Sequence, residues 1–182
     1  MNIATERAHV CRAGAIAKMA AFCAALLMLF PIVSAAQPST PDQVADIIRA
    51  AHTATSAEVF LVPDTLLTGR RIGPEDIPKI GCKYLVETAK IGELLTIIDR
   101  AKVQGSDLPD GKLREVRFMI RVLKRDSELM TMVLSRFPSE DDRLHGLVNG
   151  LPASASRDLL PSLRSWVKSL APPTHPKYTT CP

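Results

Sequence analysis

The chain has 182 residues, with 23 Lys and Arg against 19 Asp and Glu and a formal net charge of +4. This length suits one domain with one core, and so balanced a charge argues against a nucleic-acid partner, which usually requires a clustered basic surface. Because only 4% of the residues are aromatic, we expect a core of Leu, Ile and Val with some Met.

Residues 1–36 have the pattern of a cleavable export signal. Three basic residues come first, an apolar run over Met19–Phe30 follows, and small residues before Gln37 provide a cleavage site after Ala35 or Ala36. The apolar run is shorter than the roughly 20 residues that span a bilayer. We therefore expect a mature chain of about 146 residues, without a stable membrane anchor, in the periplasm or outside the cell.

The cysteines predict one disulfide in the mature chain. Cys11 and Cys23 leave with the signal, so Cys82 and Cys181 remain. An even pair in an oxidising compartment favours a bridge, which would hold the Pro-rich tail over residues 171–182. The alternative is a partly buried free Cys82 and a free Cys181 on a loose tail. The sequence contains no CxxC spacing, so a redox-active dithiol is not expected.

Residues 37–56 are predicted to form a short polar leader and an N-terminal helix. Thr40-Pro41-Asp42-Gln43 fits a helix start with Pro at the first helical position. The apolar residues that follow share one helical face: Val44, Ile47, Ile48 and Ala51. Strands at Glu58–Val62 and Cys82–Glu87 come next, and then an amphipathic helix over Ala89–Val103.

The clearest pattern is a β-hairpin in which polar Lys124–Ser127 joins two alternating strands. The alternation predicts a core side that carries Val116 and pairs Val122 with Leu129, Ile120 with Thr131 and Phe118 with Val133. The other side, here called the Arg/Met face, then carries Arg117, Met119, Arg121, Met130, Met132, Leu134 and Arg136.

The last elements are a short strand over Leu144–Val148, closed by the turn signal Asn149-Gly150, and a helix that begins after Asp158. This order predicts an α+β protein over residues 57–170. We expect a two-layer sandwich of about four or five mainly antiparallel strands with two or three amphipathic helices. The helices that begin at Ala89 and Asp158 are expected to pack on the core side of the hairpin.

No motif indicates catalysis, a metal site or a cofactor. A Gly-x-Ser-x-Gly elbow and a phosphate-binding glycine loop are both missing, and no mature histidine has a second ligand at zinc spacing. Arg70-Arg71 has the charge to bind an anion, but Gly69 beside it favours an exposed bend. We therefore predict no catalytic residue, no cofactor and no metal.

The Arg/Met face is the feature that best indicates a function. Met and Arg are enriched at the centres of protein interfaces, and Met adapts to irregular partners. We therefore predict a non-enzymatic binding module, inhibitor-, immunity- or chaperone-like, that holds a protein partner on this face, with the loop Arg70–Lys79 nearby. The alternative is that a helix, such as the one at Pro41, covers the face while the arginines reach solvent.

Two other classes of function compete with the binding module. One is an envelope enzyme whose site assembles from His145, Asp142, Asn149 and Arg136. It predicts a deep pocket around His145 with a carboxylate within hydrogen-bond reach. The other is a structural or adhesive envelope component, which predicts self-association. The sequence identifies neither a partner nor an oligomeric state.

Overall fold

A computed structural model describes residues 40–66, 68–106, 115–173 and 181. These residues belong to one compact unit, Pro38–Pro182. The predicted export signal lies outside the described residues. Within the part of the chain that is described, no helix has the length and apolar character needed to cross a membrane.

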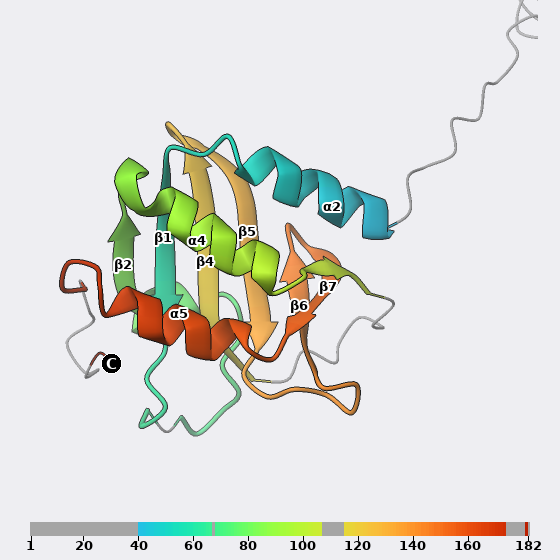
Figure 1. The fold of residues 1–182 in the computed structure, drawn as a ribbon. Coiled ribbons are helices and arrows are strands. Elements are labelled where there is room, and N and C mark those ends of the chain that lie inside the picture. Colours follow the sequence, from blue (N-terminus) through green and yellow to red (C-terminus); the bar gives the residue numbers. More distant parts are fainter. Residues whose placement is uncertain (1–39, 67, 107–114, 174–180, 182) are drawn as a thin grey trace, which may run out of the picture. The chain divides into compact units, whose positions relative to one another are not determined.

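The described residues form one antiparallel sheet with helices, so the predicted α+β class is confirmed (Figure 1). The sheet has seven strands in the order β2-β1-β4-β5-β6-β7-β3, so the expectation of about four or five strands is wrong. The strands are β1 (Ser56–Leu61), β2 (Cys82–Val86), β3 (Gln104–Gly105), β4 (Val116–Lys124), β5 (Ser127–Ser135), β6 (Arg143–Val148) and β7 (Leu151–Ser156). The helices are α2 (Thr40–Ala51), α3 (Ile77–Ile80), α4 (Thr88–Arg100) and α5 (Leu159–Val167).

The strands that the sequence analysis missed are β3 and β7. The two residues of β3 are too few for a pattern, and they pair with β7. Strand β7 reads Leu-Pro-Ala-Ser-Ala-Ser, which lacks the β-branched and aromatic residues typical of strands. The Asn149-Gly150 turn with positive φ at both residues joins β6 to β7, as expected of a type I′ hairpin.

The hairpin of β4 and β5 turns within the predicted connection Lys124–Ser127, through two unpaired residues, but its register differs from the predicted one. Next to the turn, Lys124 pairs with Ser127 and Leu123 with Glu128. Leu129 is then an extra residue, and beyond this bulge the pairs are Val122–Met130, Ile120–Met132 and Phe118–Leu134. The predicted pairs with Leu129, Thr131 and Val133 are therefore wrong, because a β-bulge shifts the register by one residue and exchanges the faces of a strand.

Each face of the sheet carries its own apolar cluster. The three longer helices lie on one face (Figure 1), here called the helix-covered face, and pack on the large cluster. That cluster includes Phe118, Ile120, Val122, Met130, Met132 and Leu134. On the second face a smaller cluster joins Phe60, Met119 and Val133 to Ile72 and Ile77 of the connection between β1 and β2. Strand β4 is therefore buried on both faces, as central strands often are.

The predicted disulfide is present. Cys82 at the start of β2 is bonded to Cys181, with the two Cα atoms 5.6 Å apart. Cys82 is fully buried in the large cluster, and Cys181 packs against that cluster. The bridge therefore fixes residue 181 to the edge of the sheet.

Candidate functional site

The predicted Arg/Met face is not one surface. Met130, Met132 and Leu134 lie on the helix-covered face with 0% exposure, and Met119 lies on the second face with 4% exposure. The exposed methionine patch expected of the binding module is therefore wrong. The alternative with a covering helix describes the methionines better, because Val44 and Ala51 of α2 belong to the same cluster as Met130 and Met132.

The three arginines of the predicted face lie apart from one another and have different partners. Arg121 stays on the surface, and the exposed fraction of its side chain is 36%. Its Nη1 lies 3.9 Å from a Glu58 carboxylate oxygen, and its Nε lies 3.7 Å from Glu128. Its guanidinium is 5.7 Å from the centre of the Phe60 ring, a cation–π distance.

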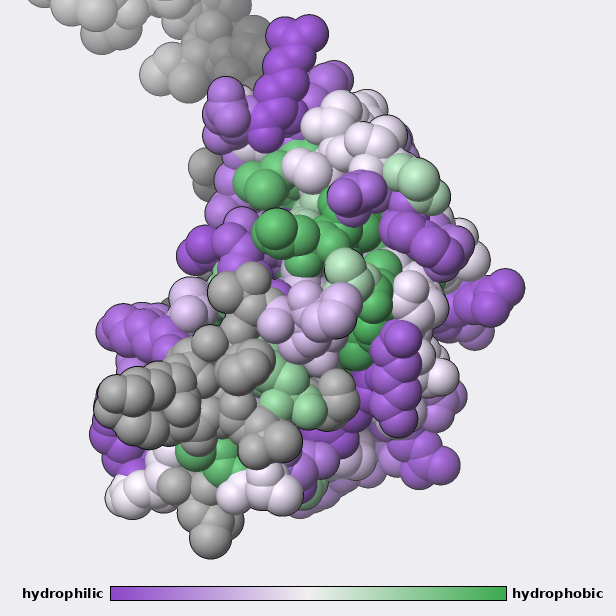
Figure 2. Space-filling model, turned by 90° about the vertical axis from the view of Figure 1, so that its left-hand side faces the viewer, coloured by the Kyte–Doolittle hydropathy of each residue, from purple (hydrophilic) through white to green (hydrophobic). Residues whose placement is uncertain are grey.

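Lys83 and Leu85 of the edge strand β2 extend this polar surface. The Lys83 ammonium lies 2.5 Å from Glu58, and Leu85 pairs directly with Glu58 across the strands. Leu85 is 61% exposed, the most of the large apolar residues described. Figure 2 views the molecule from the β2 side and shows apolar side chains between hydrophilic ones. We call Glu58, Lys83, Leu85, Arg121 and Glu128 the open patch.

Arg117 has a structural role on the same face. It is the extra residue of a second bulge, between the pairs Val116–Ser135 and Phe118–Leu134, and it is only 4% exposed. Its Nη1 donates to the carbonyl oxygens of Pro63 and Leu66, both at 3.0 Å, while Nη2 pairs with Glu115. Bulges re-aim side chains in this way, and the guanidinium fixes the chain after β1.

Asp64 follows β1, and arginines from three different parts of the chain lie near its carboxylate. One carboxylate oxygen lies 2.6 Å from Nη2 of Arg164 and 3.1 Å from Nη2 of Arg136. Burial raises the pKa of Asp64, but the hydrogen bond from Arg164 and the charges of Arg164, Arg136 and Arg117 outweigh it and lower the pKa. Asp64, Arg164 and Lys168 line a cavity of about 500 Å³.

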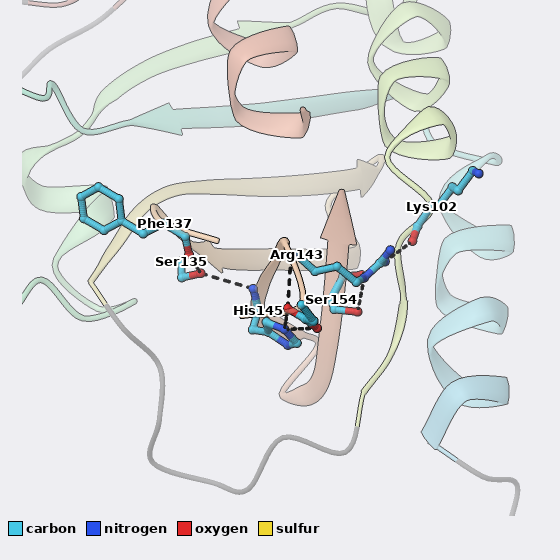
Figure 3. A network of polar contacts seen from close by, with 7 residues as sticks. Lys102, Ser135, Phe137, Arg143, His145 and Ser154 are labelled. Atoms are coloured by element: carbon cyan, nitrogen blue, oxygen red, sulfur yellow. Dashed lines mark hydrogen bonds and ion pairs between the residues drawn. The ribbon is translucent and has the colours of Figure 1, made fainter. Parts of the chain in front are cut away.

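His145 of β6 belongs to a polar network that also includes Ser135 of β5 (Figure 3). The ring Nε2 lies 2.8 Å from one carboxylate oxygen of Asp141 and 2.9 Å from the other. The hydrogen bond from His145 lowers the pKa of Asp141. The backbone N–H of His145 donates to the Ser135 hydroxyl at 3.2 Å, and that hydroxyl donates to the carbonyl of Phe137 at 3.0 Å. The carboxylate that the enzyme hypothesis expects is therefore present.

Arg143 in the same network connects three elements (Figure 3). Its Nε donates to the Ser154 hydroxyl at 3.0 Å, and its Nη2 donates to the carbonyl of Lys102 at 2.8 Å. The arginine therefore joins β6 to β7 and to the chain that follows α4. These contacts are those of a structural tie.

The residues predicted to assemble an enzyme site each have a different partner. Asp142 pairs with Arg157 and Arg136 pairs with Asp64, while Asn149 bonds to the backbone of β5. His145 lines neither the cavity beside Asp64 nor those beside Trp166 and Arg117. Over residues 40–66, 68–106, 115–173 and 181, no three His, Cys, Asp or Glu side chains gather as metal ligands would.

Comparison with known proteins finds no match to a family model, to a curated protein or to a solved structure. The open patch, the arginine clusters and the His145 network are therefore the features from which a function can be inferred.

Proposed function

We propose that this chain is an exported, non-enzymatic module that binds a protein partner through the open patch. The observation that carries the proposal is the exposed Leu85 beside a row of alternating charges on the second face of the sheet. Three long helices occupy the opposite face, and the β1–β2 connection packs near Met119 and Val133. The patch around Arg121 is solvent-accessible in the described residues.

The chemistry of the open patch suits a protein partner. An exposed Leu surrounded by polar residues resembles the apolar centre and polar rim of many interfaces. Arg121 is held by Glu58, Glu128 and the Phe60 ring, so little side-chain entropy is lost when it meets a partner. The charges at the rim favour a partner with a complementary pattern, which steers association.

The proposal also includes export of the protein to the periplasm or the medium. It is supported by the pattern of residues 1–36 and by the Cys82–Cys181 bridge, since structural disulfides persist in oxidising compartments. A periplasmic or secreted partner is therefore the class to test.

A capture experiment tests the binding proposal. Mature protein that begins at Gln37 is immobilised and exposed to native envelope extract and culture medium, beside a Leu85→Asp/Arg121→Glu variant. An Arg100→Glu variant is the control, because it reverses one charge on α4, away from the patch. We expect one partner that wild type and control retain, that the double variant loses, and that cross-links through Lys83. Equal retention by all three folded proteins contradicts the proposed surface.

A second candidate is an envelope enzyme that uses His145. The observation in its favour is the Asp141 carboxylate at 2.8 Å from Nε2, because the hydrogen bond at one ring nitrogen sets the tautomer of the imidazole. An activity screen with His145→Gln and Asp141→Asn separates the two functions, because the binding proposal predicts full partner retention in both variants.

A further inference from the structure

A small pocket lies between the start of β4 and the connection that follows β1. Its volume is about 310 Å³, and its walls are Thr68, Gly69, Arg70, Arg71, Glu115 and Arg117. The lining residues therefore include three arginines and one glutamate. The pocket is separate from the open patch that carries the proposed function.

The pocket holds positive charge that its own residues do not neutralise. Glu115 pairs with Arg117. Arg70 donates to Asp76 at 2.6 Å, and Asp76 is held in place by the Gly73 N–H at 3.1 Å. These two hydrogen bonds, with the Gly73 bond as the larger cause, keep the pKa of Asp76 low. Arg71 is exposed and forms no ion pair with the described residues.

Arg117 lines the pocket with a guanidinium whose donors are not free to meet a ligand. Its Nη1 and Nη2 are occupied by Pro63, Leu66 and Glu115. Its Nε is buried and has no hydrogen-bond partner among the described residues. Because this Nε is enclosed by the protein and a ligand oxygen cannot reach it, Arg117 contributes its positive charge to the pocket and not a hydrogen bond.

We propose that this pocket is a binding site for a phosphate-type oxyanion. Arg71 donates to its oxygens, while the positive charges of Arg117 and of Arg70, which Asp76 orients at the rim, add electrostatic attraction. Guanidinium groups suit this ligand because their planar donors match the spacing of phosphate oxygens. The ligand is inorganic phosphate or a phosphate monoester, which present the same oxygens to the pocket.

Arginine-detected NMR tests the site directly. The Nε–Hε signal of Arg117 in the mature protein is followed during titration with inorganic phosphate, methyl phosphate or acetate, at neutral pH and constant ionic strength. We expect a saturable shift with phosphate, and an affinity at least about tenfold lower in Arg71→Gln, which loses a charge-assisted hydrogen bond. Arg100→Gln removes one charge elsewhere and is expected to bind as wild type does.

The outcomes separate the sources of the ligand. Binding of both phosphates supports a monoester site, and binding of inorganic phosphate alone supports a site for the free ion. No saturable shift with either phosphate, equal affinity in Arg71→Gln, or equally tight acetate binding overturns the proposal.

A second pair of variants tests the site without removing an arginine, so that an effect of Arg71→Gln on folding is not mistaken for loss of binding. A Cβ atom at Gly69 meets nothing within 4 Å, so this position accepts a side chain. We expect Gly69→Glu, whose carboxylate competes for the same guanidinium groups, to lose the phosphate response, and Gly69→Gln to keep it. A Gly69→Glu protein that binds phosphate as tightly as Gly69→Gln contradicts the site.

Discussion

The two faces of the sheet differ in how they are covered. On the helix-covered face, residues such as Ile120 and Met132 are completely buried beneath three helices. On the second face, the apolar cluster around Met119 is covered by the β1–β2 connection, while Arg121 reaches solvent. A helix buries a wide apolar face through packing alone, whereas the connection is held partly by the buried guanidinium of Arg117.

Alternation of apolar and polar residues alone does not assign the faces of this hairpin. Met119 and Ile120 are neighbours on opposite faces, yet both are buried. Because β4 is apolar on both sides, the sequence pattern of β5 has to decide the register, and a single bulge at Leu129 moves its methionines from one face to the other.

The largest expected effect comes from a charge placed on the helix-covered face. Met132→Asp puts a carboxylate among fully buried apolar residues. We expect a loss of about 5 kcal/mol or more in the free energy of unfolding, enough to unfold a domain of ordinary stability. The matched control Thr131→Asp lies on the second face and is expected to cost about 1 kcal/mol. Similar losses in urea denaturation of the two variants would contradict the observed register.

Removal of the disulfide is expected to have the next largest effect. The bridge joins residues 99 positions apart, and for a loop of this length the chain-entropy model gives a stabilisation of about 4–5 kcal/mol. Reduction and the double variant Cys82→Ala/Cys181→Ala are both expected to lower the Tm of the mature protein. A Tm that is unchanged on reduction would show that the bridge contributes no stability.

Arg117→Met tests how the second face is covered. This change leaves the carbonyls of Pro63 and Leu66 and the carboxylate of Glu115 without their donor. We expect a loss of about 3 kcal/mol, because one partner of a buried charged network is removed. Limited proteolysis is expected to cut the chain near Leu66 faster. Arg121→Met, at the surface, is expected to cost at most about 1 kcal/mol, and an equal loss would contradict this assignment.

The smallest predicted effect is a decrease in the free energy of unfolding at low pH. The pKa of Asp64 in the folded chain lies below its ordinary value of 3.8, because its arginine partners outweigh burial. The ionised carboxylate therefore makes its full contribution to stability at pH values above the ordinary pKa. This contribution is lost as the pH falls through the pKa that Asp64 has in the folded chain. We expect Asp64→Asn to reduce the acid dependence of the unfolding free energy. An acid limb as steep as that of wild type would contradict the lowered pKa.

Local patterns in the sequence predicted most of the helices and strands. The apolar faces that begin at Val44 and Ile91, the alternation of β4 and the Asn149-Gly150 turn each depend on neighbouring residues. The disulfide followed from the predicted compartment and the count of cysteines. These features need no knowledge of distant contacts.

The features that the sequence did not predict depend on contacts between residues that are far apart in the chain. Asp64 meets Arg164 one hundred residues away, and Arg117 becomes a buried tie only because the chain after β1 folds back over the sheet. No local signal marks the bulge at Leu129. The position of the methionines, and with it the candidate binding surface, therefore required the structure.

Methionine oxidation gives the most direct test of the central claim that the hairpin buries its methionines and leaves Arg121 on the surface. Peroxide is applied to the native mature protein and to the urea-unfolded chain, and the sulfoxide at Met119, Met130 and Met132 is followed by peptide mass spectrometry. We predict that all three methionines oxidise much more slowly in the native protein than in the unfolded chain, since each is at most 4% exposed. Oxidation of Met119 and Met132 at the unfolded rate would show an exposed methionine face and contradict the account.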